Sequence, residues 1–284
     1  MKSVPFFKVV GSGNDFILLD QRRKPFSGDP SRFAQTWCDR KRGVGADGLL
    51  LALPSRKAAA RMRIFNPDGS EAEMCGNGLR CLVRYLYSKP EGSGAASSSR
   101  GHQNGKSRSL SVETPAGLMR AQIIGKDQVR VFMSRPKNLR LGQKLKAAGK
   151  SYQVHSVNSG VPHAVLLVSH LEKAEMEILG PVIRHHRFFK PAGTNVNAVR
   201  IDSPHRIAIR TYERGVEGET LACGTGAVAA VVIGTALGKL ASPVQVKTAG
   251  GEVLSVGFRQ SRQPWEELYL EGPAQILFEG GIPQ

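Results

Sequence analysis

The sequence predicts a mixed α/β (α+β) protein made of two similar halves, and three observations lead to this prediction. A chain of 284 residues is long enough for two domains of about 140 residues each. One motif occurs twice, at Glu71–Gly78 and Glu219–Gly226: a glutamate, a cysteine four residues later, Gly-x-Gly and an apolar helical run. The order of strands, turns and helices around each copy is the same, which indicates an internal duplication.

The first half is predicted to contain short strands and two helices. The strands cover residues 6–10, 16–20, 49–53, 61–65, 110–114, 117–123 and 128–133, which are rich in β-branched and apolar residues. One helix covers residues 29–40 and starts with the N-cap Asp29. The other carries apolar residues at helical spacing from Leu79 to about Lys89, so Cys75 lies at or just before its N-terminus.

Three glycine-rich segments of the first half are interpreted as turns or surface loops. Gly11–Asp15 is predicted as a tight turn, with Asn14 either a turn former or a ligand presented on a loop. Gly43–Gly48 lacks the lysine and hydroxyl residue of a phosphate loop and precedes a strand. Residues 91–109 are rich in Gly and Ser and basic, which is typical of a surface excursion within a domain.

The second half repeats this outline. Its predicted strands cover residues 152–157, 164–168, 207–212, 244–246, 253–256, 268–270 and 274–278. Helical segments are expected at 172–179 and 181–187, a loop at 193–197, and an apolar helix after Cys223. The chain is therefore divided into a lobe of residues 1–130, which carries Cys75, and a lobe of residues 131–273, which carries Cys223. The two cysteine helices are expected to face each other across a cleft.

Composition limits the possible classes of protein. The net charge is +17, but Lys and Arg are scattered and aromatic residues make up only 6%, so we expect a basic surface and no nucleic-acid partner. Met1–Lys8 lacks the apolar region of a signal peptide, and no apolar run approaches the ~20 residues of a membrane span. Four cysteines without metal-like spacing suggest free thiols. We therefore expect a cytoplasmic protein that does not enter a membrane.

The two motif cysteines predict acid–base chemistry with a pair of thiols. A helix N-terminus stabilises a thiolate, and its unpaired N–H groups bind an anion such as a carboxylate. If Cys75 and Cys223 lie on opposite sides of one carbon, a thiolate can remove its proton while a thiol returns one to the other face. The predicted reaction is inversion at a carbon next to a carboxylate, with the helix dipoles stabilising the developing charge.

The remaining thiols and the histidines are assigned to structure. Cys38 and Cys81 fall inside predicted helices and are expected to pack in the core. His155 and His163 lie near the second glycine turn, but no His or carboxylate spacing supports a metal site. No metal or cofactor is therefore expected.

The motifs resemble those of the diaminopimelate epimerase family along nearly the whole chain. The matching segments are Gly11–Phe16, Gly43–Gly48, Ile64–Glu71, Cys75–Cys81, Pro162–His163, Tyr212–Gly215 and Cys223–Gly226. The resemblance implies conversion of LL- to meso-diaminopimelate for lysine and cell-wall synthesis, without pyridoxal phosphate or metal, by a homodimer. It also implies that each lobe is a β-barrel-like sheet wrapped around a central helix, and that the C-terminal strand, residues 274–284, returns to the first lobe.

The resemblance also assigns roles to individual residues. Cys75 and Cys223 become the acid–base pair, and Asn66 and Glu213 hold the ammonium group of the reacting centre. The residues whose backbone N–H groups receive its carboxylate are Gly76, Asn77, Gly224 and Thr225. Those that read the distal end of the substrate are Asn14, Asn195 and Arg214.

Two departures and two alternatives accompany this assignment. The family often has Gln where this chain has Gly48, and commonly Asn where it has Val161, so Asn158 is a hypothetical substitute for that distal contact. A proline racemase-like enzyme is the nearest alternative, although its substrate would not need Arg214 and the distal asparagines. A redox or nucleic-acid-binding protein is the alternative from another class, suggested by the thiols and the charge.

Overall fold

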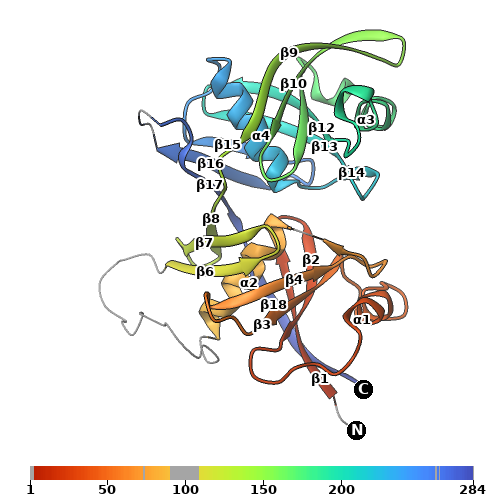
Figure 1. Ribbon diagram of the computed structural model, residues 1–284, viewed down its shortest axis with the longest axis vertical. Coiled ribbons are helices and arrows are strands. Elements are labelled where there is room, and N and C mark those ends of the chain that lie inside the picture. Colours follow the sequence, from red (N-terminus) through yellow and green to blue (C-terminus); the bar gives the residue numbers. More distant parts are fainter. Residues whose placement is uncertain (1–2, 73, 90–108, 260, 262, 284) are drawn as a thin grey trace. The chain divides into compact units, whose positions relative to one another are not determined.

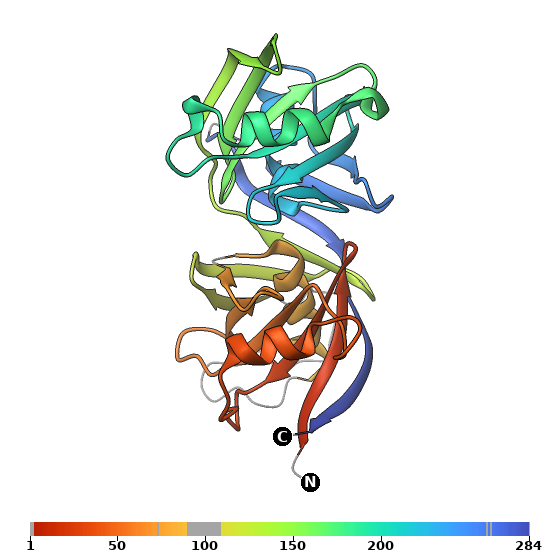
Figure 2. The ribbon, with the colours of Figure 1, turned by 90° about the vertical axis from the view of Figure 1, so that its right-hand side faces the viewer.

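The computed structural model describes residues 3–72, 74–89, 109–259, 261 and 263–283. The chain divides into two compact units: unit 1 comprises Met1–Val131 and Gly272–Gln284, and unit 2 comprises Phe132–Glu271. In each unit the strands surround one helix and a second helix packs outside them (Figure 1, Figure 2). The predicted α+β fold of two similar halves is confirmed. The predicted surface excursion at 91–109 lies outside the described residues except for Ser109.

Unit 1 contains helices α1 and α2 and a mostly antiparallel sheet. Its elements are β1 (Ser3–Gly11), β2 (Asn14–Asp20), α1 (Pro30–Trp37), β3 (Gly48–Leu53), β4 (Ala60–Phe65), β5 (Glu71–Ala72), α2 (Gly76–Ser88), β6 (Ser109–Thr114), β7 (Gly117–Ile123), β8 (Gln128–Phe132) and β18 (Gln275–Pro283). The pairs β2–β3 and β4–β6 are parallel. The pairs β1–β2, β3–β4, β4–β5, β6–β7 and β7–β8 are antiparallel.

Unit 2 repeats this topology. Its elements are β9 (Lys137–Ala147), β10 (Lys150–Asn158), β11 (Pro162–Leu167), η1 (Leu171–Lys173), α3 (Met176–Arg184), η2 (Arg187–Phe189), β12 (Asn195–Ser203), β13 (Arg206–Glu213), β14 (Gly218–Thr220), α4 (Gly224–Ala236), β15 (Val244–Lys247), β16 (Val253–Arg259) and β17 (Glu266–Pro273). The pairs β11–β12 and β13–β15 are parallel. The pairs β10–β11, β12–β13, β13–β14, β15–β16 and β16–β17 are antiparallel.

The strand registers define which positions of the two units are equivalent. In unit 1, Leu50 of β3 pairs with Ile64 of β4. In unit 2, Asn197 of β12 pairs with Thr211 of β13 in the same place. The parallel pairs β2–β3 and β11–β12 give the same correspondence, since Phe16 pairs with Gly48 and His163 pairs with Asn195. Phe16 therefore corresponds to His163. The duplication can therefore be followed residue by residue.

One strand of each repeat is exchanged between the units. β18, the last strand of the chain, pairs antiparallel with β1 of unit 1, and the two lie side by side in Figure 2. β9 directly follows the strands of unit 1 but pairs antiparallel with β10 of unit 2. β9 could not be predicted from the sequence, because most of its side chains are exposed and only Leu145 and Ala147 are buried, which leaves little apolar alternation.

The central helix of unit 2 is buried because its surface is apolar. In α4, ten residues from Gly224 to Gly234 are buried, and apolar side chains occupy every face. Val228, Val231 and Val232 are 0% exposed and belong to the apolar core of unit 2. Burying a valine stabilises a fold by about 1.5–3 kcal/mol, so this helix anchors the sheet around it.

Two local predictions differ from the structure. In place of the two helical segments at 172–179 and 181–187 there is one α-helix, α3, which spans Met176–Arg184 and continues through Pro181. Met176, Leu179 and Ile183 share its buried face. The predicted loop 193–197 instead leads into β12 at Asn195, and the side chains of Asn195 and Asn197 are buried between paired strands. Polar residues in a buried strand do not show the apolar pattern on which the prediction depends.

The turn predicted at Gly11–Asp15 is shorter than expected. Asn14 and Asp15 belong to β2, and Gly11 of β1 pairs directly with Asn14. Only Ser12 and Gly13 connect the strands, and both have positive φ, 53° and 81°.

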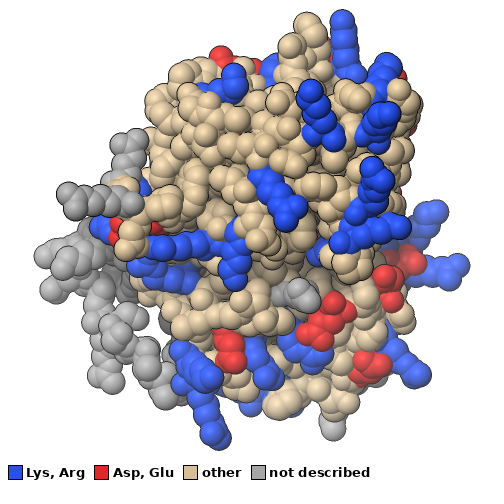
Figure 3. Space-filling view, turned by 45° about the horizontal axis from the view of Figure 1, so that its top comes forward, with Lys and Arg blue, Asp and Glu red and all other residues tan. Residues whose placement is uncertain are grey.

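Surface charge and hydropathy add two general observations. Lys and Arg are spread over the face of the molecule shown in Figure 3 and do not gather in a single patch. Among the described residues, no helix is long and apolar enough to span a membrane.

Candidate active site

Cys75 is the N-cap of α2, the central helix of unit 1. Its backbone is extended, with φ −139° and ψ 113°, and its Sγ accepts a hydrogen bond from the N–H of Gly78 at 3.3 Å. A Cβ added at Gly78 would lie 2.9 Å from Leu50 Cδ2, so the glycine lets the start of the helix pack closely on the sheet. The predicted position of Cys75 at a helix N-terminus is confirmed.

Cys223 is the N-cap of α4, the central helix of unit 2. Its backbone is also extended, with φ −119° and ψ 108°, and its side chain is 7% exposed. Its Sγ lies 3.5 Å from Oγ1 of Thr225, where either atom can donate. A Cβ added at Gly226 would lie 2.5 Å from Oδ1 of Asn197, so this glycine is required for close packing of the helix start against β12.

Each cysteine is thus followed by helical residues whose N–H groups point out of the helix end. The first N–H groups of a helix have no partner within it and carry the positive end of the dipole. Gly76 and Asn77 begin α2, and Gly224 and Thr225 begin α4. Each unit therefore places a thiol beside backbone donors suited to a carboxylate.

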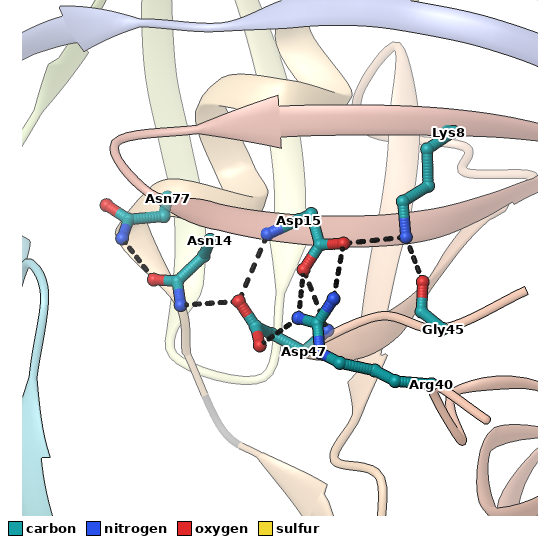
Figure 4. Close-up of polar contacts among 7 residues, drawn as sticks. All are labelled: Lys8, Asn14, Asp15, Arg40, Gly45, Asp47 and Asn77. Atoms are coloured by element: carbon teal, nitrogen blue, oxygen red, sulfur yellow. Dashed lines mark hydrogen bonds and ion pairs between the residues drawn. The ribbon is translucent and has the colours of Figure 1, made fainter.

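Asn14 and Asn77 form one hydrogen-bonded chain in unit 1 (Figure 4). Nδ2 of Asn77 donates to Oδ1 of Asn14 at 2.6 Å, and Nδ2 of Asn14 donates to Oδ2 of Asp47 at 3.0 Å. Arg80, which is 0% exposed, donates to Oδ1 of Asn77 at 2.9 Å. Both amides are therefore held in a fixed orientation, with a cation at one end of the chain and a carboxylate at the other.

A cluster of charges supports this chain (Figure 4). Arg40 bridges Asp15 at 2.6 Å and Asp47 at 2.7 Å, and Lys8 contacts Asp15 at 2.7 Å. Burial raises the pKa of Asp15, but the hydrogen bonds from Arg40 and Lys8 outweigh it and lower the pKa to about 2. Asp15 is therefore ionised at neutral pH. This cluster could not be predicted from the sequence, because Arg40 and Asp15 are distant in the chain.

Asn66 and Glu213 occupy equivalent places, at the ends of β4 and β13. Nδ2 of Asn66 donates to Oγ of Ser70 at 2.9 Å within its own turn. Oε2 of Glu213 accepts a hydrogen bond from Oγ1 of Thr220 at 2.9 Å. Burial raises the pKa of Glu213 above its ordinary value, and the hydrogen bond from Thr220 opposes this shift only in part.

Asn195 and Arg214 are brought together in unit 2. Oδ1 of Asn195 accepts a hydrogen bond from the backbone N–H of Arg214 at 2.8 Å, and its Nδ2 donates to the carbonyl of Pro162 at 3.0 Å. The guanidinium of Arg214 donates to the carbonyl of Ala192 at 3.3 Å. Asn195 thus fixes the backbone that carries Arg214.

The contacts of His163 were not predictable from the sequence. This residue is 0% exposed, and its Nε2 lies 2.9 Å from Oγ1 of Thr225. Its Nδ1 lies 3.1 Å from Nδ2 of Asn197. Burial, together with the charge of Arg214, lowers the pKa of His163 to about 3, so the ring is neutral at pH 7. The alternation of Asn195 and Asn197 along one strand was the available signal for a buried polar site.

The two departures from the family pattern have local explanations. A Cβ at Gly48 would lie 2.8 Å from the carbonyl oxygen of Phe65, so a side chain there requires a shift of β4. Oδ1 of Asn158 accepts the N–H of Gly160 at 3.0 Å, which closes the turn before Val161. That Asn158 replaces the distal contact stays a hypothesis.

Within the part of the chain that the structure describes, no group of three or more His, Cys, Asp or Glu side chains is placed to hold a metal ion. His155 instead accepts the backbone N–H of Gly142 at 3.1 Å through its Nδ1.

The sequence is similar to known epimerases over nearly its full length. A sequence profile of the diaminopimelate epimerase family matches residues 6–139 and 155–277. A protein of Methanocella arvoryzae named diaminopimelate epimerase is 40% identical over 296 residues, covering 99% of this chain and 98% of its own. A protein of the same name from Desulforudis audaxviator is 41% identical over 290 residues, covering 97% and 98%.

Solved structures share the fold at low sequence identity. A PhzF-family phenazine biosynthesis protein from Bacillus anthracis has a TM-score of 0.71 at 16% identity, covering 100% of both chains. A probable proline racemase from Agrobacterium radiobacter K84 has a TM-score of 0.70 at 16% identity, covering 99% of this chain and 93% of its own. From the family profile and the full-length relatives, the chain belongs to the diaminopimelate epimerase family.

Proposed function

We propose that this protein interconverts LL- and meso-2,6-diaminopimelate, as an isomerase in the synthesis of lysine and peptidoglycan precursors. Relatives with that name share 40% of their residues over 99% of this chain. The structural observation that carries the proposal is the repeated N-cap cysteine, because both Cys75 and Cys223 begin the central helix of their unit. Inversion at one carbon needs two proton-transfer groups, and the duplication supplies two.

The proposed reaction moves one proton off and one proton onto the same carbon. The thiolate of one cysteine takes the proton of the α-carbon, and the electron pair stays on the carbon and its carboxylate. The thiol of the other cysteine then gives its proton to the opposite face. After one turnover the cysteine that was a thiolate is a thiol, and the other is a thiolate. This is the protonation state that the product isomer needs for the reverse reaction. No external oxidant, reductant or cofactor is consumed.

Both charged groups of the reacting centre have proposed partners. The backbone N–H groups of Gly76, Asn77, Gly224 and Thr225 receive the carboxylate, where they stabilise the charge that grows as the proton leaves. Asn66 and Glu213 accept hydrogen bonds from the ammonium group. Supporting this assignment, the two residues hold equivalent places: Asn66 directly follows β4, and Glu213 is the last residue of β13.

The distal amino-acid group is assigned to Asn14, Asn195 and Arg214. The fixed orientation of the Asn14 amide supports this role. An amide that is already oriented loses less conformational entropy on binding a substrate than an amide that rotates freely. A second carboxylate suits the bidentate geometry of Arg214. Proline has no second amino-acid end for these residues to bind, so they favour diaminopimelate as the substrate.

The experiment that tests the proposal is isotope exchange in heavy water. With LL-diaminopimelate, deuterium should enter the α-carbon as the meso form appears, and proline should show no exchange. Mass spectrometry and NMR measure both. Exchange with proline alone would replace the proposal with a proline racemase activity, and exchange with neither would reject both.

Cysteine variants test the two-thiol mechanism separately from the substrate. Cys75→Ala and Cys223→Ala should each lower turnover by at least about 100-fold, the usual scale of a lost acid or base. Cys81→Ala, which removes a buried thiol of α2 that the mechanism does not use, is the matched control and should keep turnover. Full activity in either active-site variant would eliminate the two-thiol mechanism.

The proposal extends to assembly and location, for which the family resemblance is the support. We propose a homodimer in the cytoplasm. Leu277 and Phe278 of β18 are each 52% exposed, and exposed apolar side chains of this size are suited to a subunit contact. Sedimentation of the full chain measures the assembly, and a monomer at micromolar concentration would contradict it.

A further inference from the structure

Of the three residues assigned to the distal end of the substrate, Arg214 alone carries a charge. Its guanidinium donates to the carbonyl of Ala192 at 3.3 Å, and its backbone N–H donates to Oδ1 of Asn195 at 2.8 Å. Within the described parts of the chain, no carboxylate forms an ion pair with this guanidinium. A guanidinium that is paired with a carboxylate must lose that partner before it binds another in the same bidentate manner. The unpaired state of Arg214 is therefore the state that a substrate carboxylate requires.

A carboxylate nevertheless lies on the turn that carries Arg214. Glu217 follows it by three residues in the turn between β13 and β14, across which Glu213 pairs with Gly218. Oε1 of Glu217 accepts the backbone N–H of Gly215 at 3.0 Å, which lowers the pKa of Glu217, so this group is ionised at pH 7. Glu217 also has a φ of 53°, in a region that residues other than glycine seldom occupy. The turn thus holds a negative charge close to Arg214.

Arg184, the last residue of α3, binds this carboxylate. Its Nε and Nη2 each lie 3.1 Å from Oε1 of Glu217. Its Nη1 donates at 3.3 Å to the carbonyl of Ala192, the same oxygen that accepts from Arg214. The two guanidinium groups are therefore neighbours on one carbonyl oxygen, but only Arg184 is neutralised by a carboxylate.

The packing of α3 determines the position of Arg184. One turn earlier, Gly180 lies against β13, where an added Cβ would be 2.5 Å from the ring of Tyr212. Gly193 leaves room for the guanidinium, since an added Cβ there would overlap Nη1 of Arg184. The backbone N–H of Thr194 donates to the carbonyl of Arg184 at 3.3 Å. The side chain of Arg184 is only 13% exposed, so this ion pair is more shielded from solvent than a pair on an open surface.

We name Arg184, Ala192 and Glu217 the Arg184 clamp. We propose that the Arg184 clamp holds the carboxylate of Glu217 away from Arg214, and so keeps the Arg214 guanidinium available for the distal carboxylate of the substrate. Arg184 and Glu217 are positioning residues, because both act through Arg214. The inference rests on the proposed function in one respect, the assignment of Arg214 to that carboxylate.

A purely structural role for Arg184 makes a different prediction. If Arg184 only ties the loop 190–193 to the turn, removal of Glu217 cannot restore what the loss of Arg184 has removed. If Arg184 withholds Glu217 from Arg214, removal of Glu217 restores substrate binding. The other groups that face this carboxylate are His185, whose Nε2 lies 3.7 Å from Oε2 of Glu217, and Tyr212, whose pKa is raised by burial and by the charge of Glu217. Both stay in place in every variant below.

Steady-state kinetics with LL-diaminopimelate tests the order of these effects. Arg184→Gln should raise KM by at least about threefold, the scale of one ion pair near the surface, and leave kcat unchanged. Adding Glu217→Gln to that variant should return KM to the value of the parent. Arg200→Gln is the matched control, since it removes another arginine of unit 2 that is paired with an acid, Asp202 at 2.7 Å, and should not change KM. A raised KM that persists in the double variant would overturn the proposal, as would a KM that Arg184→Gln does not change.

Urea unfolding without substrate tests the Arg184 clamp independently of the proposed function. With Arg184 present, Arg214→Gln should shift the unfolding midpoint equally whether residue 217 is Glu or Gln. In the Arg184→Gln background the shift should be larger with Glu217, because Arg214 and Glu217 then form a pair. Arg184→Met, which keeps the packed aliphatic stem and removes the charge, should give the same pattern and replaces Arg184→Gln if that variant does not fold. No coupling between Arg214 and Glu217 in either background would refute the clamp, whereas no turnover of diaminopimelate by the parent would refute only the proposed function.

Discussion

Glu213 is a partly buried carboxyl group, and folding and substrate binding favour different protonation states of it. Burial raises its pKa, so the folded protein holds a proton on this group more tightly than the unfolded chain does. Contact with a substrate ammonium requires the ionised form. The stability of the parent protein therefore decreases as the pH rises through the raised pKa of Glu213, while its capacity to bind the ammonium increases.

Glu213→Gln should separate these two effects. It should lower kcat/KM by roughly tenfold to a hundredfold, the cost of one hydrogen bond between charged groups. Relative to the parent, its free energy of unfolding should increase from pH 4 to pH 7, because Gln cannot ionise. Denaturant titrations at several pH values measure this. Glu217→Gln is a control of opposite sign, since the pKa of Glu217 is lowered by the N–H of Gly215; a common trend in both variants would contradict the assignment.

Asp15 supports the candidate site through charge. Its pKa is lowered to about 2 from 3.8, so ionised Asp15 stabilises the fold above pH 4 and loses this effect as the pH falls toward 2. Asp15→Asn should cost at least about 2 kcal/mol at pH 7, because buried Lys8 also loses its partner. The difference from the parent should shrink below pH 4 in urea titrations. A difference that is constant from pH 2 to 7 would show that charge is not the cause.

At the scale of elements, the two helix starts depend on glycines that allow contact with the sheet. At Gly226, an added Cβ would meet Oδ1 of Asn197 at 2.5 Å. Asn197 is held by two strands and cannot retreat, so the start of α4 must shift instead. The start of α4 carries both the thiol and the proposed carboxylate donors.

Gly226→Ala should therefore lower kcat by about 100-fold, the effect of misplacing reacting groups by about 1 Å. The melting temperature should fall little in comparison. Gly238→Ala is the control. Gly238 lies beyond the C-terminus of α4, and an added Cβ there would meet no atom within 4 Å. Its positive φ means that the substitution costs some stability, but it creates no steric clash. Equal losses of activity in the two variants would count against the contact with Asn197.

These elements show what could be predicted from the sequence. The N-cap positions of Cys75 and Cys223 were predictable, because a glycine turn followed by apolar residues at helical spacing is a local pattern. The start of β12 at Asn195 was not, because its buried side chains are polar. Their hydrogen bonds to Pro162, Ala164 and His163 join two strands that are distant in the chain, and a single sequence contains no record of that proximity.

At the scale of the whole molecule, the duplication supplies one N-cap cysteine in each unit, and the exchange of β9 and β18 connects the repeats. Ile282 of β18 is 1% exposed and packs with Val4 and Phe6 of β1 in the core of unit 1. The sheet of unit 1 therefore depends on residues from the far end of the chain, whereas the strands that unit 2 pairs are continuous in sequence.

Removal of residues 275–284 should destabilise unit 1 selectively, by at least about 3 kcal/mol from the loss of buried Ile282 alone. Hydrogen exchange should accelerate in β1, which loses its ladder to β18, and stay slow in β12 and β13. Ile282→Ala in the full chain is the graded control, with a smaller effect in the same place. Equal acceleration in both units would mean that they unfold as one.

The same strand exchange sets an order of events while the protein is being made. A ribosome releases β1 before β18, so the half that is synthesised first waits until β18 has emerged before its sheet can close. The half synthesised second has all its strands available as soon as Glu271 has emerged. The usual sequence, in which the N-terminal part of a protein folds first, is therefore reversed in this chain.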